Sequence, residues 1–289
     1  MDKAKKVKIK TKDNILLQGE ILSGPNPKAV VLINPATATK TSYYKEFAKY
    51  LVENGFAVFL WNYRGICISK SETLAGSQYK FSDIGKYDVP AAIDKVSSLF
   101  PNLPLLCIGH SAGGQQFGFT DQHKKLQILI AVASSSGYFY QMPFAYRLKA
   151  LFFFKIFAPI SNLFFGYVAA SKFKFMEDLP TSFVKEWNQW CSEKELFFSP
   201  KYYNNLLPQD AYKNFNFAIH VMTADDDEIS TPKNIENFWK NIHSKKGIVF
   251  TRYSACNFPN KKIGHFGYFK KSSKRIWEDI LKLLNESIS

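Results

Sequence analysis

The chain has 289 residues, 46% of them hydrophobic, which suits one domain with a large core or a core domain with an insertion. Lys and Arg number 38 against 24 Asp and Glu, a formal net charge of +14, but the basic residues are dispersed. Since no basic stretch is interleaved with stacking aromatics, we expect no nucleic-acid partner. The four cysteines form no CxxC pair, which argues against a zinc site or a disulfide framework.

Two segments bear on location. The N-terminus from Met1 is charged and leads into an alternating segment without an apolar core, so we expect no signal peptide and a cytoplasmic protein. Residues 150–170 are mostly apolar and rich in Phe, but Lys155, Pro159 and Asn162 are unfavourable in a spanning helix. A cap that covers a pocket is the favoured interpretation. A membrane span and an interfacial helix at a membrane surface are the weaker alternatives.

The order of elements predicts the fold class. Apolar runs of strand length alternate with amphipathic helices, which indicates βαβ units and a mostly parallel sheet flanked by helices, an α/β fold. The predicted elements are a hairpin over 7–21, strands at 29–34, 57–63, 103–108, 126–133, 217–222 and 247–253, and helices at 42–54, 84–100, 232–243 and 273–284.

One long stretch interrupts this alternation. The roughly 80 residues between the strands at 126–133 and 217–222 have no strand signal and are rich in Phe, Tyr and Trp. We therefore predict a helical cap insertion over residues 139–212, with residues 1–138 and 213–289 forming the core domain.

A candidate nucleophile lies in Gly109-His110-Ser111-Ala112-Gly113, a G-x-S-x-G pattern. The glycines have a steric reason, because Cβ atoms two residues either side of the serine would collide in a strained strand-to-helix turn. The pattern follows an apolar strand and precedes an apparent helix over 114–120, which is the context that a nucleophile elbow requires. Ser111 is therefore predicted to be a nucleophile.

A candidate acid follows the strand at 217–222, where Asp225, Asp226, Asp227 and Glu228 stand in a row. Functional residues in a parallel sheet lie at the carboxyl ends of strands, so all four qualify. One of them is also expected to cap the helix that begins near Pro232.

The candidate base is His265, which glycines flank in a loop before the last helix. Of the other four histidines, His110 lies inside the elbow, His123 and His243 lie in polar surroundings, and His220 lies inside a strand. Only His265 has the loop placement that a mobile imidazole needs.

These residues make the chain resemble an α/β-hydrolase over nearly its whole length. It is similar to a little-characterised bacterial branch with Gly-His-Ser-Ala-Gly-Gly-Gln at 109–115, Tyr-Arg-Gly-Ile at 63–66 and Gly-His-Phe-Gly at 264–267. The chain order of serine, acid and histidine is the order of that fold. In such hydrolases the acid commonly stands two residues before Ile or Val, so the resemblance implies Asp227 in preference to Asp226.

The stretch that supplies the oxyanion hole departs from the family pattern. Many relatives have His-Gly after the first core strand, but here the residues are Asn34-Pro35-Ala36-Thr37. Pro35 has no N–H to donate. The backbone N–H groups of Ala36 and Ala112 are the preferred donors, with Thr37 in reserve.

The predicted reaction is attack of Ser111 on a small-molecule ester or thioester with a largely apolar acyl group. His265 is the general base, Asp227 orients it, and no cofactor or metal takes part. An acyltransferase or peptidase on the same three residues, a non-catalytic binding module and a membrane-surface protein remain as alternatives. The oligomeric state is left open. The aromatic insertion is expected to line the substrate pocket, with candidates Phe152, Phe153, Phe157, Phe164 and Trp187.

Overall fold

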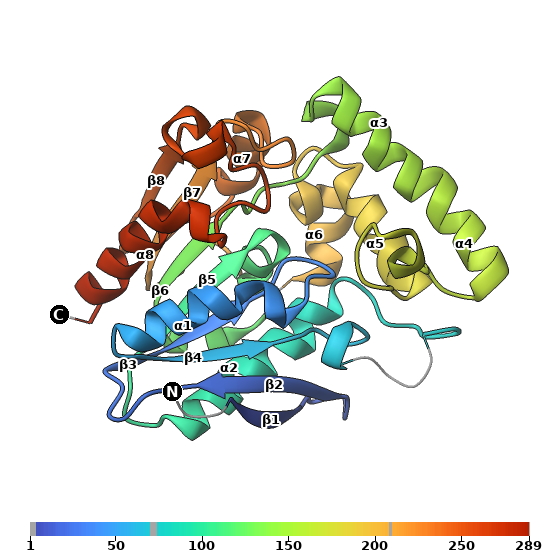
Figure 1. Ribbon diagram of the computed structural model, residues 1–289. Helices are drawn as coiled ribbons and strands as arrows, with labels where there is room; N and C mark the ends of the chain where they lie inside the picture. The colour runs from blue at the N-terminus through green and yellow to red at the C-terminus, as the bar shows by residue number, and fades with distance from the viewer. Residues whose placement is uncertain (1–3, 70–73, 208–209, 289) are drawn as a thin grey trace.

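The core of the protein is one eight-stranded sheet with strand order β1-β2-β4-β3-β5-β6-β7-β8 (Figure 1). The computed structural model describes residues 4–69, 74–207 and 210–288. Strands β2 and β4 are antiparallel, as are β1 and β2, and the pairs from β4 to β8 are parallel. The strands are β1 (Lys5–Lys10), β2 (Leu16–Leu22), β3 (Ala29–Asn34), β4 (Phe56–Trp61), β5 (Leu105–His110), β6 (Leu126–Val132), β7 (Ala218–Ala224) and β8 (Ile248–Tyr253).

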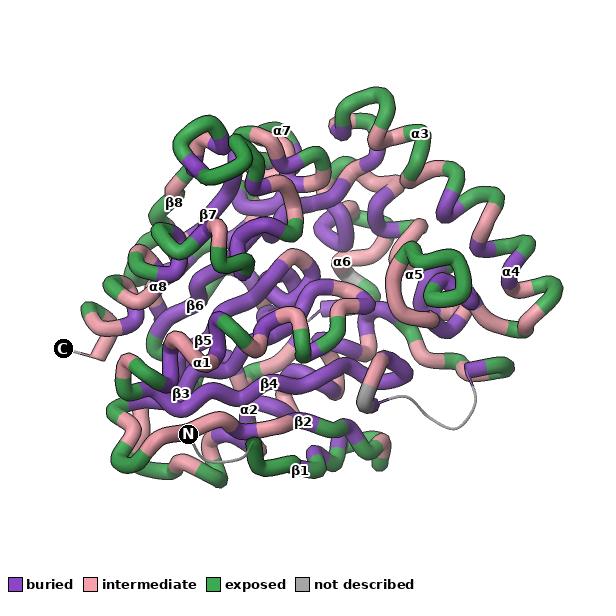
Figure 2. Tube along the Cα trace, viewed as in Figure 1, coloured by how far each residue is buried: buried purple, intermediate pink, exposed green. Residues whose placement is uncertain are grey.

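Helices cover both faces of this sheet and give it two cores. Side chains alternate across β3, so that Val30 and Leu32 join the core under α2 and α7, while Val31 and Ile33 join the core under α1 and α8. The central strands are buried along their whole length (Figure 2). The core helices are α1 (Lys45–Glu53), α2 (Val89–Leu99), α7 (Pro232–Trp239) and α8 (Lys274–Glu286). The predicted α/β architecture is confirmed.

One predicted helix is wrong. In place of a helix over 114–120, the chain makes two 3-10 turns at Ser111–Gly114 and Phe117–Phe119. The segment contains Gly113, Gly114 and Gly118. Each glycine disfavours an α-helix by about 1 kcal/mol relative to alanine, and close backbone packing takes the place of regular helix here.

Helices without a strand fill the described residues between β6 and β7. They are α3 (Phe144–Phe152), α4 (Ala158–Phe165), α5 (Thr181–Cys191) and α6 (Pro200–Leu206). A π turn at Phe153–Phe157 joins α3 and α4 into one continuous helix of 22 residues, which lies at the outer end of the molecule (Figure 1). By length and composition alone, this helix is apolar and long enough to cross a membrane. The predicted bounds of the insertion, 139–212, include residues 208–209, which lie outside the described residues.

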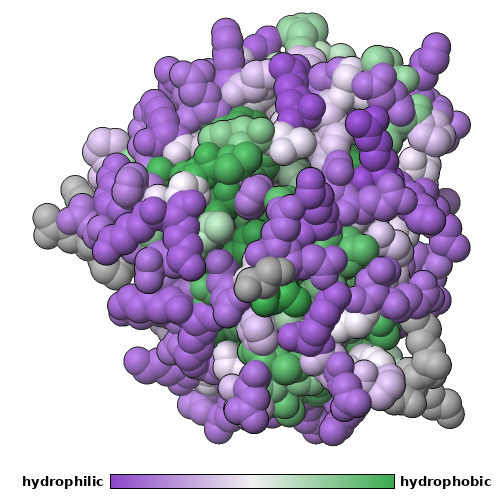
Figure 3. Space-filling model, turned by 90° about the vertical axis from the view of Figure 1, so that its left-hand side faces the viewer, coloured by the Kyte–Doolittle hydropathy of each residue, from purple (hydrophilic) through white to green (hydrophobic). Residues whose placement is uncertain are grey.

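Strand β8 is the edge of the sheet away from β1, and it lies on the other side of the molecule from α3 and α4 (Figure 1). Figure 3 shows this side of the molecule, where a hydrophobic area is surrounded by mostly hydrophilic side chains. Val249 and Phe250 of β8 are about half exposed. These two residues form an exposed apolar pair that is distant from α3 and α4 (Figure 1).

A buried arginine ties the antiparallel end of the sheet to α2. Arg64 follows β4 and is 1% exposed. Its Nε donates to the carboxylate of Asp88 at 2.8 Å, and its two terminal nitrogens donate to Asp13 at 2.6 and 3.0 Å. Asp13 lies in the turn of the β1–β2 hairpin and Asp88 immediately precedes α2. The Tyr-Arg-Gly-Ile motif therefore holds three elements together.

Candidate active site

Ser111 lies on a sharp turn at the carboxyl end of β5. Its φ is +52°, a left-handed conformation that a residue with a side chain adopts only at a cost. A Cβ on Gly109 would lie 2.5 Å from the carbonyl oxygen of Gly113, and a Cβ on Gly113 would lie 2.2 Å from the carbonyl oxygen of Asn34. Both glycines of the G-x-S-x-G pattern are therefore sterically required. The turn raises Ser111 above the sheet, as the sequence motif predicts.

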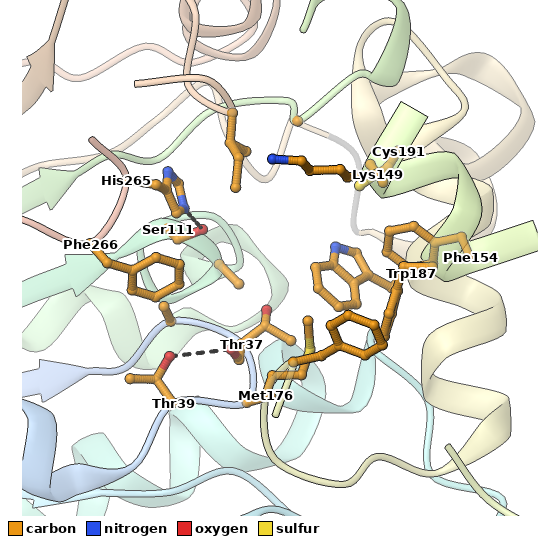
Figure 4. Close-up of a pocket in the computed structure, with 18 of the residues that line it drawn as sticks. Thr37, Thr39, Ser111, Lys149, Phe154, Met176, Trp187, Cys191, His265 and Phe266 are labelled. Atoms are coloured by element: carbon orange, nitrogen blue, oxygen red, sulfur yellow. Dashed lines mark hydrogen bonds between the residues drawn. The ribbon is translucent and has the colours of Figure 1, made fainter. Parts of the chain in front are cut away.

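Asp227 and His265 complete a hydrogen-bonded row with Ser111. Asp227 lies just past the carboxyl end of β7. Its Oδ2 and Oδ1 lie 2.9 and 3.0 Å from Nδ1 of His265. Nε2 of His265 lies 2.9 Å from Oγ of Ser111 (Figure 4). The imidazole is thus placed to accept the hydroxyl proton while the carboxylate holds its other nitrogen.

The electrostatics favour an ionised Asp227. Its side chain is fully buried, and burial alone would raise the pKa of the carboxyl group. The neighbouring His265, together with N–H donors from Ser230 and Ile229, outweighs that effect and holds the pKa below its usual value. A carboxylate therefore lies beside Nδ1 of His265, where it would stabilise an imidazolium.

The chain belongs to a known hydrolase family. A model of the family described as serine aminopeptidase, S33, matches residues 25–180, more than half of the chain. This is an α/β-hydrolase of that family. No curated protein matches the sequence.

Solved structures share the fold of this hydrolase at low identity. A soluble variant of monoglyceride lipase from Saccharomyces cerevisiae, in complex with a substrate analogue, is 16% identical with a TM-score of 0.65, and the match covers 100% of this chain and 96% of the lipase. An esterase from Exiguobacterium antarcticum is 15% identical with a TM-score of 0.62, over 96% of this chain and 99% of the esterase. At these identities the comparison concerns the fold alone.

The neighbours of Asp227 have other partners in this hydrolase. Asp226 accepts the backbone N–H groups of Ile263 and Gly264, each at 2.9 Å, and so anchors the loop that carries His265. Asp225 accepts hydrogen bonds from the two residues that follow β8. The expectation that an acidic residue caps α7 is wrong, because the hydroxyl of Thr231 caps it by accepting the N–H of Asn234.

Sequence reasoning missed a buried pair beside the histidine. Nδ1 of His110 lies 2.8 Å from the hydroxyl of Tyr44, and Nε2 of His110 lies 2.9 Å from the backbone carbonyl oxygen of His265. Burial, with a contribution from His265, lowers the pKa of His110 to about 3. His110 is therefore neutral near pH 7. Because a carbonyl only accepts, Nε2 of His110 carries the proton and Nδ1 accepts from Tyr44.

This pair also bears on the predicted oxyanion hole. Ala36 and Ala112 are the predicted donors, and the N–H of Ala36 here donates to the hydroxyl of Tyr44 at 2.8 Å. The neighbouring Thr37, which was held in reserve, and Ala112 both line the cavity next to Ser111. No hydrogen bond of the Thr37 amide is found within the described residues.

The cavity above Ser111 has a volume of about 1110 Å³. It runs from Ser111 and His265 on the core to Trp187, Phe154 and Met176 on the insertion (Figure 4). The lining contains few charged side chains, which are Lys40, Lys149 and Glu177 besides the histidine. Within the described residues, no group of His, Cys, Asp and Glu has the arrangement to hold a metal ion.

The insertion places three of the five predicted pocket residues in the lining. Phe152, Phe153 and Trp187 line the cavity, but Phe157 and Phe164 do not. Phe157 packs against the rings of Phe173 and Phe175, and Phe164 is 75% exposed on the outer face of α4. A run of apolar residues on one helix points to all sides, so its sequence alone does not identify the inward face. Lining residues that the sequence analysis missed include Met142, Tyr146, Phe154, Met176 and Cys191.

Proposed function

We propose that this protein is a serine hydrolase that cleaves an ester or thioester of a small, largely apolar acyl substrate through an acyl-enzyme. The observation that carries the proposal is the 2.9 Å contact between Oγ of Ser111 and Nε2 of His265 at the floor of an apolar cavity. A nucleophile and a base at this distance, with Asp227 on the far nitrogen of the base, are the parts that acyl transfer requires.

In the proposed first step, Oγ of Ser111 bonds to the acyl carbon as its proton passes to Nε2 of His265. The carbonyl oxygen becomes an oxyanion, which the N–H groups of Thr37 and Ala112 stabilise. The intermediate collapses when the bond to the leaving alcohol or thiol breaks, and that group takes the proton from His265. Water then loses a proton to His265 and attacks the acyl carbon. The bond to Oγ of Ser111 breaks, Oγ takes the proton from His265, and the acid leaves.

The charges in the lining support an apolar acyl group over a peptide with a free N-terminus. An aminopeptidase needs an unpaired carboxylate to bind the α-ammonium group of its substrate. Among the described lining residues, Glu177 has the one carboxylate, and Nζ of Lys40 lies 3.0 Å from it. Lys149 adds a further positive charge. Peptidase and acyltransferase activity are therefore the less favoured alternatives on the same three residues.

The test is covalent labelling. A fluorophosphonate reacts with the activated serine of such hydrolases, and we expect the adduct on Ser111 by peptide mass spectrometry. Ser111→Ala should remove both the label and turnover of p-nitrophenyl esters. Ser134 is a matched control, since it lies next to the elbow but is fully buried and donates to the carbonyl of Ser111 at 2.8 Å. Labelling of the wild type at another serine, with Ser111 unmodified, would refute the proposal.

A further inference from the structure

The continuous helix Phe144–Phe165 carries a row of apolar side chains that the described residues leave largely exposed. They stand at every fourth position and are all about half exposed or more. We call this row the apolar ridge, and it consists of Phe144, Leu148, Phe152, Ile156, Ile160 and Phe164. The outward turns of this helix are exposed from end to end (Figure 2). A 22-residue helix is about 33 Å long, and the ridge runs along nearly its whole length.

The π turn keeps the ridge on one side. In an α-helix of 3.6 residues per turn, a row at every fourth residue drifts round the axis by about 40° per step. The turn at Phe153–Phe157 is wider and accommodates one more residue, which reverses part of that drift. The exposed apolar residues of α3 and α4 therefore face outward together.

The inner face of the same helix is packed, which fixes how the ridge is presented. Phe153 and Phe154 are buried, and the rings of Phe154 and Trp187 lie 4.9 Å apart in an edge-to-face contact. Ala158 and Ser161 are buried further along. The helix is thus held flat across the insertion, an orientation that suits contact with a surface and not passage through a bilayer.

The loop that follows α4 extends the apolar surface. Phe173 and Phe175 are each about half exposed, and their rings pack against Phe157 at 5.1 and 4.9 Å between centroids. Monomeric proteins seldom leave so many large apolar side chains exposed side by side unless the patch has a partner.

The charge along the ridge is mostly positive. Between Phe139 and Met176 the sequence has no Asp or Glu, and its basic residues are Arg147, Lys149, Lys155, Lys172 and Lys174. Glu177 and Asp178 follow directly, but Lys40 pairs with Glu177, and Asp178 accepts hydrogen bonds from Ser171. Two copies of the chain meeting through this face would bring these cations together, which disfavours a dimer here. An anionic surface is the complementary partner.

We propose that the apolar ridge docks the protein on the surface of a bilayer that contains anionic phospholipid, with the basic residues at the headgroups. This is the chemistry of an interfacial helix, which has apolar side chains at the acyl boundary and Lys or Arg beside them. It favours the interfacial helix that the sequence analysis ranked below a simple cap.

The ridge also adjoins the cavity. Leu148 and Phe152 belong both to the ridge and to the cavity lining, and Phe175 of the adjoining loop also lines the cavity. Docking therefore places apolar side chains of the cavity wall at the lipid boundary. If the proposed hydrolase activity holds, an apolar substrate enters from the lipid without crossing water. Docking itself does not depend on that activity.

The test is co-sedimentation of the full chain with large unilamellar vesicles. Vesicles of phosphatidylcholine alone are compared with vesicles that contain about 30% phosphatidylglycerol. We expect binding to the anionic vesicles to be at least about tenfold stronger, and to fall when the salt rises from roughly 0.05 to 0.5 M.

Matched variants distinguish binding through the ridge from non-specific hydrophobic adsorption to the vesicles. Ile156→Gln with Phe164→Gln, neither of which lines the cavity, should weaken binding to anionic vesicles at least about tenfold. Val249→Gln with Phe250→Gln, a pair of similar exposure on the far edge strand, should bind within about twofold of the wild type. Equal binding by the two double variants would overturn the proposal.

Charge variants test the second half of the interface. Lys155→Gln, Lys172→Gln and Lys174→Gln together should reduce binding more than the exposed control set Lys8→Gln, Lys10→Gln and Lys12→Gln on the hairpin. Equal losses of vesicle binding by the two triple variants would mean that only the net charge matters, and would overturn the proposal that this face docks.

Three further outcomes would overturn the proposal: no binding of the wild type to either vesicle, a pellet that resists carbonate extraction, and a dimer in lipid-free solution that the ridge variant dissociates. The second outcome indicates a spanning helix and the third a second copy of the chain. Fluorophosphonate labelling of each variant reports on the active site separately. If the wild type binds vesicles but is not labelled by the fluorophosphonate, the docking proposal is supported and the proposed function is refuted.

Discussion

Nε2 of His110 donates a hydrogen bond to the backbone carbonyl of His265 at 2.9 Å. His110, which directly precedes the candidate nucleophile, therefore anchors the backbone of the candidate base. The same imidazole accepts from Tyr44, whose hydroxyl accepts the N–H of Ala36. Three buried groups thereby connect the loop after β3 to the loop that carries His265. His110 does not touch the reacting atoms, and we regard it as a positioning residue.

The first prediction concerns this contact. His110→Phe keeps a ring of similar size but removes both hydrogen bonds, so the His265 loop loses one of its anchors. We expect kcat for p-nitrophenyl acetate to fall about tenfold to a hundredfold while KM changes little, as for other groups that orient a ligand or base. Steady-state kinetics check this. A variant with unchanged kcat would show that the loop needs no support from His110.

The second prediction concerns acid stability. The pKa of His110 is about 3 in the folded protein against 6.5 for an ordinary histidine, so the unfolded chain binds the extra proton between these values. Stability from this group is therefore present above pH 6.5 and is lost as the pH falls toward 3. Between pH 7 and 5 the loss is about 2 kcal/mol.

Urea unfolding at pH 7 and pH 5 measures this loss. His110→Gln cannot titrate in this range, so its free energy of unfolding should fall by about 2 kcal/mol less than that of the wild type between the two pH values. Equal pH dependence in both proteins would place the titrating group elsewhere.

The third prediction ranks the two aspartates. In Asp227→Asn the side-chain amide donates to Nδ1 of His265, which forces the proton onto Nε2 and leaves no acceptor for the Ser111 proton. We expect kcat to fall by about 10³- to 10⁴-fold. Asp226→Asn keeps one oxygen for the amides of Ile263 and Gly264, and should lose about tenfold or less. The reverse ranking in ester turnover would make Asp226 the acid.

The elbow was predictable because local rules determine it, since the glycines around Ser111 are needed by the turn itself. An acidic residue after β7 was also predictable, but the preference for Asp227 over Asp226 came from the family resemblance and its two-residue step to Ile229. The engaged amide of Ala36 was not predictable. It depends on Tyr44, eight residues on, and on His110, which the sheet brings beside them.

The insertion was predictable as helical but not in its orientation. Phe152, Phe153 and Phe154 follow one another on a helix, so they point to different sides, and tertiary packing decides which side faces the cavity. The π turn shifts the phase again. Phe164 was predicted to line the pocket and instead lies on the outer face of α4.

The fourth prediction concerns the buried arginine. Arg64→Met leaves the carboxyl group of Asp88, which is fully buried, without its cation. Breaking a buried pair in this way costs about 3 to 5 kcal/mol, which urea unfolding at pH 7 should show. Burial already raises the pKa of Asp88 to about 7, so adding Asp88→Asn to the variant should recover part of the loss. A fall in the free energy of unfolding of less than about 1 kcal/mol would mean that other interactions replace the Arg64–Asp88 pair.

The fifth prediction concerns the wall of the cavity. Phe153 and Trp187 line it from the insertion, while Ser111, His265 and Asp227 belong to the core. Phe153→Ala or Trp187→Ala enlarges the cavity, so the best p-nitrophenyl ester should become longer. Each methylene that enters the new space is worth about 0.8 kcal/mol, or roughly fourfold in kcat/KM.

Turnover of the acetate ester should change little in these variants, because the reacting groups are untouched. Phe164→Ala is the matched control, since it removes a phenyl ring from the same helix at a position outside the lining. In lipid-free buffer its chain-length profile should equal that of the wild type. The profiles are measured as kcat/KM from acetate to dodecanoate. If Phe153→Ala and Trp187→Ala keep the wild-type optimum, the acyl chain does not lie along this wall. A shift in Phe164→Ala of the same size would mean that the helix moves as a whole, and that no single ring sets the length.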